Sequence, residues 1–185
     1  MREAKVDVEW ARAPQTSERT VRMARLVYVP VVHSIAEMGS AAEAYQAAFA
    51  ARYGERKLAE RSTEFDAIWR AIGEGIRSLR LDLKRVNLYQ DSLPICGHER
   101  ALVHEIASQG SRNHQLLEAL ADSGALLVGT ESPSLLLDEY RLIQSPERTE
   151  AQGAALLDAR DHFIAGRVDE TLSEDRTGIL FIGAL

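Results

Sequence analysis

Cysteine is almost absent from this sequence, which contains only Cys96 among its 185 residues. A single cysteine excludes a framework of internal disulfides and suits a reducing cytoplasm. Residues 1–22 lack the apolar segment of a secretory signal peptide. The longest apolar runs, Leu26–Val32 and Ile179–Leu185, are far too short to cross a bilayer. The expected protein is therefore soluble and cytoplasmic, without a membrane partner.

Basic residues are fewer than acidic ones, which argues against a nucleic-acid partner. Acidic residues outnumber basic ones by 28 to 22, and the two kinds are interleaved along the chain. Because no basic stripe is present, we expect no nucleic-acid partner. The sequence contains no GxGxxG, P-loop, HExxH, GxSxG or paired CxxC motif. Nucleotide binding through a glycine-rich loop and ordinary serine-hydrolase chemistry are therefore disfavoured.

The composition that remains is that of a globular protein, with 45% hydrophobic and 27% charged residues. Residues 1–22 are polar and have no sustained period, which indicates a poorly ordered extension. Residues 23–185 are predicted to form a single α/β domain, since their number is about that of one domain. Frequent alanine and arginine suit a bacterial source.

Four short apolar runs predict strands, and helical patterns fill the intervals between them. The runs are Arg25–Val32, Val86–Tyr89, Ala125–Val128 and Ile179–Ile182. The first run is continuously apolar rather than alternating, which is typical of a strand covered on both faces. Two predicted helices separate each strand from the next. This alternation predicts a mainly parallel sheet of about four strands covered by helices.

Helix starts and stops are marked by capping residues, glycine and proline. A capping-box pattern from Ser40 to Glu43 begins the first helix, and Gly54 ends it. The second helix carries apolar residues from Leu58 to Leu79, with a restart near Ser62 or Thr63 left open. The remaining helices are predicted over His98–Gln109 and Ser111–Ser123, from Ser132-Pro133 onward, and from Ser145-Pro146 to about Leu172.

Polar residues follow the first three strands at His33, Asp91 and Glu131. In open parallel sheets, ligands bind where loops leave the carboxyl ends of the strands. A histidine and two carboxylates at that edge can supply a general base with an orienting partner, or ligands for a divalent metal. The alternative is that Asp91 and Glu131 cap helices or loops and that His33 bonds a backbone carbonyl.

The last helix adds a charged pair to this set. Its apolar face runs through Leu157, Ile164 and Val168, and helical spacing puts Asp161 within that face, with Arg160 beside it. An Arg–Asp pair on a core-facing side is costly unless it is paired or lines a polar cavity. Arg160 can therefore hold an anionic group or a developing oxyanion, or form a salt bridge that ties the helix to the sheet.

Two residues at another helix start complete the candidate set. Arg112 and Asn113 lie in Ser111-Arg112-Asn113-His114, from which both side chains could face the site. Together with Asp91 and Asp161, they are the residues expected to contact a substrate.

These motifs resemble those of the Tiki/TraB-like superfamily, which includes TraB pheromone-shutdown proteins, Tiki proteases, erythromycin esterases and haem-binding lipoproteins. That family has a strand ending in GxxH, a glutamate near the end of a later strand, a helix bearing an arginine, and a second GxxH. The matching segments here are Pro30–His33 with proline for glycine, Gly129–Glu131, Arg160–Ala165 close to RDxxxA, and Ile182–Leu185 without the final histidine.

The resemblance implies hydrolysis, with His33, Glu131 and Arg160 as catalytic residues. In that chemistry His33 is either the base or a ligand of a divalent metal, with Glu131 as its partner, and the two alternatives stay open. Because the second histidine is missing, a non-catalytic chain and a fragment cut short at Leu185 both stay open. Two other hypotheses remain: a small-ligand or signal-sensing domain for a small molecule or peptide, and a structural domain that forms a homo-oligomer through its C-terminal strand.

Overall fold

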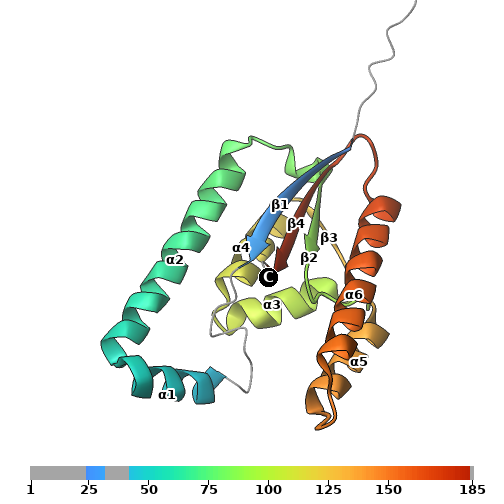
Figure 1. Ribbon diagram of the computed structural model, residues 1–185. Helices are drawn as coiled ribbons and strands as arrows, with labels where there is room; N and C mark the ends of the chain where they lie inside the picture. The colour runs from blue at the N-terminus through green and yellow to red at the C-terminus, as the bar shows by residue number, and fades with distance from the viewer. Residues whose placement is uncertain (1–23, 32–41, 184–185) are drawn as a thin grey trace, which may run out of the picture.

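Figure 1 shows the computed structural model, which describes residues 24–31 and 42–183. Within these ranges the chain forms four strands, six α-helices and one 3-10 helix. No helix in them is long and apolar enough to cross a membrane. In chain order the elements are β1 Arg25–Val31, α1 Ala42–Tyr53, α2 Glu55–Ser78, η2 Leu83–Arg85, β2 Val86–Gln90, α3 Glu99–Ser108, α4 Arg112–Asp122, β3 Leu126–Val128, α5 Pro133–Gln144, α6 Glu150–Thr171 and β4 Thr177–Gly183.

The four strands form one parallel sheet in the order β1-β4-β2-β3. The predicted α/β fold with a parallel sheet is therefore confirmed. The last strand, β4, lies in the middle, where Leu180 pairs with Tyr28 on one side and Tyr89 on the other. Both edges of β4 are paired within the sheet, and a homo-oligomer through the C-terminal strand stays a prediction.

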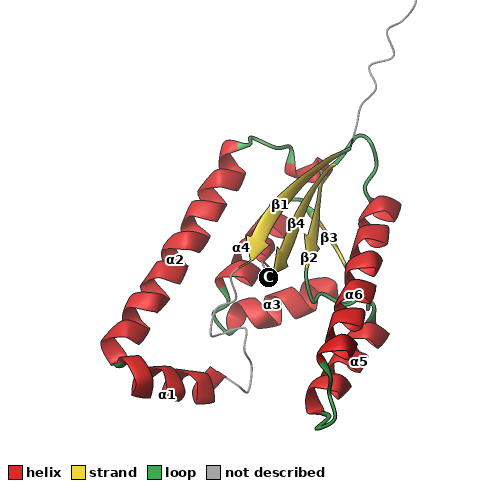
Figure 2. Ribbon diagram, viewed as in Figure 1, coloured by secondary structure: helices red, strands yellow, loops and turns green. Residues whose placement is uncertain are grey.

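Helices cover the two faces of the sheet unequally (Figures 1 and 2). On one face, α2, α3 and α4 pack against the strands through residues such as Trp69, Val103 and Leu117. On the other face, α6 contributes Ile164 and Val168, and α5 packs against α6. The core on this second face includes side chains from β2, β3 and β4, and none from β1.

In the part of the chain that the structure describes, β1 is covered on one face only, so the prediction that it is covered on both is wrong for these residues. Val29 and Val31 are buried beneath the α2 side, whereas Leu26 is 46% exposed and Tyr28 is 56% exposed. The reason is topological: β1 lies at the edge of the sheet, beyond the strands whose side chains pack against α6. A continuous apolar run in the sequence predicts a strand, but it does not show which helices pack against each face of that strand.

The start of α6 also differs from the prediction. Ser145 ends α5 and Pro146 lies in the turn that follows, so the expected helix start at Ser145-Pro146 is wrong. Instead, Thr149 caps α6 in a reciprocal capping box with Gln152. This box satisfies backbone donors at the helix start, which a serine and proline farther upstream cannot do.

Gly54 separates the first two helices, as predicted. Its φ of 86° lies in the left-handed region that side-chain-bearing residues rarely adopt. Helix α2 then continues unbroken from Glu55 to Ser78, without a restart near Ser62 or Thr63. The proposed cap at Ser40 lies outside the described residues.

Candidate functional site

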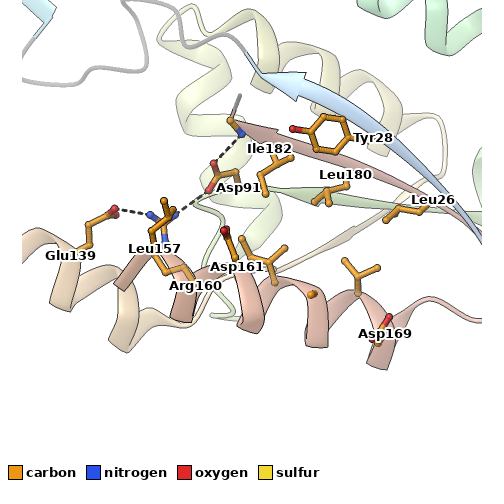
Figure 3. Close-up of a pocket in the computed structure, with 14 residues that line it drawn as sticks. Leu26, Tyr28, Asp91, Glu139, Leu157, Arg160, Asp161, Asp169, Leu180 and Ile182 are labelled. Carbon is orange, nitrogen blue, oxygen red and sulfur yellow. Dashed lines mark hydrogen bonds and ion pairs between the residues drawn. The ribbon is translucent and has the colours of Figure 1, made fainter. Parts of the chain in front are cut away.

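The Arg160 guanidinium lies among three carboxylates at the carboxyl edge of the sheet. Figure 3 shows two of these ion pairs, with Asp91 and Glu139. Its Nη2 is 2.5 Å from Glu131 Oε1 and 3.0 Å from Asp91 Oδ1, and its Nη1 is 2.7 Å from Glu139 Oε1. Arg160 Nε also donates to Glu131, at 3.2 Å from Oε1. Asp91 follows β2, Glu131 follows β3, Glu139 is on α5 and Arg160 is on α6. We call these four residues the carboxylate cluster.

Backbone hydrogen bonds hold Glu131 against the loop that follows β2. The amides of Thr130 and Glu131 both donate to Leu93 O at 3.0 Å, and Ile95 N donates to Glu131 O at 3.0 Å. The Thr130 hydroxyl donates to Gln90 O. These contacts extend the parallel pairing of β2 and β3 beyond the strand ends, and they direct the Glu131 side chain toward Arg160.

Gly129 allows this close approach of two backbone segments. A Cβ at position 129 would lie 2.9 Å from Ile95 Cα and 3.0 Å from Pro94 O, both of which are backbone atoms. Any side chain at this position would therefore push the loop away from Glu131. The glycine in Gly129-Thr130-Glu131 thus has a geometric role in placing the glutamate.

Asp91 connects the cluster to the central strand. Its Oδ2 accepts a hydrogen bond from Gly183 N at 3.2 Å, and its backbone amide donates to Phe181 O at 2.8 Å. Its side chain is 17% exposed, whereas that of Glu131 is fully buried. Asp91 and Glu139, which is 38% exposed, are therefore the carboxylates of the cluster that reach the surface.

Burial and ion pairing act in opposite directions on the pKa values of Glu131 and Arg160. Burial raises the pKa of Glu131, and the nearby charge of Asp91 raises it further, while the hydrogen bonds and charge of Arg160 act in the opposite direction. Burial would lower the pKa of Arg160, but the hydrogen bonds and charges of Glu131, Glu139 and Asp91 outweigh it and raise that pKa. Arg160 therefore stays a cation. The cluster remains net negative even when Glu131 holds a proton.

A groove of about 840 Å³ opens beside the cluster, between α6 and the β1–β4 pair. Asp91, Glu139, Arg160 and Asp161 lie at one end of it, and Asp169 lies toward the other end (Figure 3). Apolar side chains form most of the remaining lining: Leu26, Tyr28, Leu157, Ile164, Ala165, Val168, Leu180 and Ile182. The groove exists because α6 leaves the outer face of β1 uncovered.

Four of the residues that the sequence selects come together here. Asp91, Glu131 and Arg160 are within hydrogen-bond distance of one another through the guanidinium, and Asp161 lines the same groove. His33, the first candidate by sequence, lies outside the described residues. The rule that ligand sites occur at the carboxyl ends of parallel strands therefore selects a real juxtaposition of side chains.

Arg112 and Asn113 are not among the residues that line the groove. The Arg112 guanidinium binds Asp66 of α2, with Nε 2.8 Å from Oδ1, on the opposite face of the sheet from α6. Asn113 is buried and donates to Gln90 Oε1 at 3.0 Å, and Gln90 in turn donates to Asp91 O. Asn113 thus supports the segment that carries Asp91, and substrate contact by either residue stays a prediction.

Glu139 is a member of the cluster that the sequence interpretation omitted. It shares a half-buried stripe of α5 with Leu135, Leu136 and Leu142. These residues are three or four positions from it, so helical spacing places a carboxylate on the inward face. The same criterion that selected Asp161 on the last helix would have selected Glu139.

The described residues include no group of three His, Cys, Asp or Glu side chains arranged to hold a metal ion. In the cluster, Asp91, Glu131 and Glu139 are directed at one guanidinium instead. Metal binding by His33 and Glu131 stays a prediction, since one of the two ligands lies outside the described chain.

No protein family, curated protein or solved structure matches this chain. The Tiki/TraB-like relationship therefore stays a prediction that depends on the short motifs ending in His33 and Glu131 and the motif beginning at Arg160.

Proposed function

We propose that this chain binds a small organic ligand in the groove between α6 and the β1–β4 pair. The observation that carries the proposal is an apolar groove beside a buried, net-negative cluster. Sites for small molecules have volumes of about 300–1,000 Å³ and combine apolar walls with a few fixed polar groups. The groove, at about 840 Å³, has both properties.

Folding alone does not account for this arrangement. Burying a guanidinium with three carboxylates costs desolvation energy that an apolar side chain in the same place avoids. Leaving Leu26 and Tyr28 exposed forgoes the favourable transfer of their apolar surface from water. Both features are explained if a ligand contacts the exposed side chains and the cluster orients it.

The groove should bind a neutral apolar fluorophore such as N-phenyl-1-naphthylamine, with saturable brightening on titration. Ala165→Trp should weaken this binding by about tenfold or more. Ala165 is exposed and lines the groove, so the indole would fill the ligand's space without displacing the core. Ala155→Trp is the matched control, because Ala155 is also exposed on α6 and does not line the groove. Equal affinities in the two folded variants, verified by circular dichroism, would overturn the proposal.

Hydrolysis is a second candidate, favoured by the position of Asp91. Its carboxylate lines the groove, is held by Arg160 and the Gly183 amide, and has Glu131 of raised pKa behind it. A fixed carboxylate can take a proton from an attacking water and return it to the leaving group. The Tiki/TraB resemblance supports the same reaction class.

Hydrolysis is tested with a panel of chromogenic esters and amides. For any substrate that is cleaved, Asp91→Asn should lower kcat/KM by about 100-fold or more, because it removes the proton acceptor. His33→Ala and a chelator titration test the base and metal that the resemblance implies. Asp66→Asn, a carboxylate change on α2, should leave the rate unchanged. Undiminished cleavage by Asp91→Asn would reject hydrolysis at this site and leave the binding proposal intact.

A further inference from the structure

We infer that the ligand of the groove is an aliphatic polyamine, a hydrocarbon chain with an ammonium group at each end. This inference depends on the proposed function, because it names the ligand class of the same groove. It follows from the charges along α6, from the apolar surface between them, and from the charge balance of the cluster.

Two carboxylates of α6, Asp161 and Asp169, line the groove at separate points (Figure 3). Neither makes a hydrogen bond or an ion pair with any residue that the structure describes. They stand eight positions apart on one helix, which corresponds to about 12 Å along its axis. The groove therefore offers two separated anionic positions with which no described residue forms an ion pair.

The surface between these carboxylates is apolar. Ile164, Ala165 and Val168 of α6 line this stretch, facing Leu26 and Leu180 of the sheet. A methylene chain lying here would remove hydrocarbon from water along its whole length, which is favourable. A ligand with one amine satisfies one carboxylate only, and a neutral ligand satisfies neither. An amine at each end of a hydrocarbon chain satisfies both.

The charge of the cluster favours the same ligand class. Among the described residues that line the groove, Arg160 is the single cationic one, and it is paired with Asp91, Glu131 and Glu139. Because three carboxylates surround one guanidinium, the potential at that end is negative and attracts an ammonium group. An anionic head group would meet Asp161 and Asp169, and no described residue of the lining offers it a free cation, so this lining disfavours fatty acids and phosphate esters.

Isothermal titration calorimetry of the full chain with α,ω-diamines of increasing length tests this inference. Affinity should rise from 1,4-diaminobutane toward the members whose nitrogens span about 12 Å, and spermidine should bind as well. A monoamine of similar length should bind about tenfold more weakly. Asp161→Asn and Asp169→Asn should each reduce diamine affinity by about tenfold and remove the preference for length.

Asp158→Asn is the matched control, since it makes the same charge change on α6 at an exposed position outside the groove. An equal loss of affinity in this control would show general attraction between charges and overturn the inference. Absence of diamine binding to a wild-type chain that binds the neutral fluorophore would also overturn it, while the proposed groove site would stand. If Ala165→Trp has no effect on either compound, both proposals fail.

Discussion

Replacing Arg160 with methionine should lower the free energy of unfolding by about 3–5 kcal/mol, the cost of removing one partner from a buried ion pair. Methionine keeps much of the volume of the side chain, and removes its charge. Glu131 would then be fully buried without a cation, close to Asp91 and Glu139. Urea unfolding followed by circular dichroism measures the loss.

The loss in this variant should depend on pH in a defined direction. Without Arg160, burial and the neighbouring carboxylates raise the folded-state pKa of Glu131 further above its unfolded value of about 4.3. An acid of raised folded pKa stabilises the fold below its unfolded pKa, and this contribution is lost as the pH rises through the folded pKa. The deficit relative to wild type should therefore shrink on going from about pH 8 toward about pH 5.

Arg112→Met is the control for this experiment. Arg112 and its partner Asp66 are about half exposed, so water screens the pair, and its loss should cost less than about 1 kcal/mol. Arg160→Met could lower the free energy of unfolding no more than Arg112→Met does, or its loss of stability could grow as the pH falls. Either result would show that the buried charge of Glu131 does not depend on Arg160.

The fold could be predicted well because its strands are short apolar runs in a simple alternation with helices. The run at Ile179–Ile182 contains Phe181 and Ile179, which are fully buried at the centre of the sheet. The pattern could not show which strands pack against α6. Strand β1 has a similar apolar run, but its side chains are not part of the core beneath α6. Strand order depends on packing between distant segments, which local periodicity does not record.

The site could be predicted in part, for a related reason. Asp91 and Glu131 were selected by their positions after strands, and Arg160 by its place beside the apolar face of a helix, both of which are local properties. Glu139 follows no strand, and only its spacing of three and four residues from Leu136 and Leu135 marks it as facing inward. Arg112 neither follows a strand nor lies on the apolar face of a helix, so neither rule supported its selection. Helix α4 places it on the other side of the sheet.

A double variant separates the stability of the carboxylate cluster from its function. Glu131→Leu combined with Arg160→Met should be more stable than Arg160→Met alone by about 2 kcal/mol or more, because no buried charge is left without a partner. Asp91 and Glu139 remain, and both are partly exposed to water.

The same double variant should lose the chemistry of the site. If the cluster is retained for orienting a ligand or for proton transfer, the double variant should bind the neutral fluorophore normally and lose hydrolytic activity on any substrate the wild type cleaves. A double-mutant cycle in urea, with both single variants, measures the coupling between Glu131 and Arg160. A double variant no more stable than Arg160→Met would assign the cost to lost packing of the arginine side chain. A stable but inactive double variant would indicate that an apolar pair serves the fold and that the charges are kept for the groove.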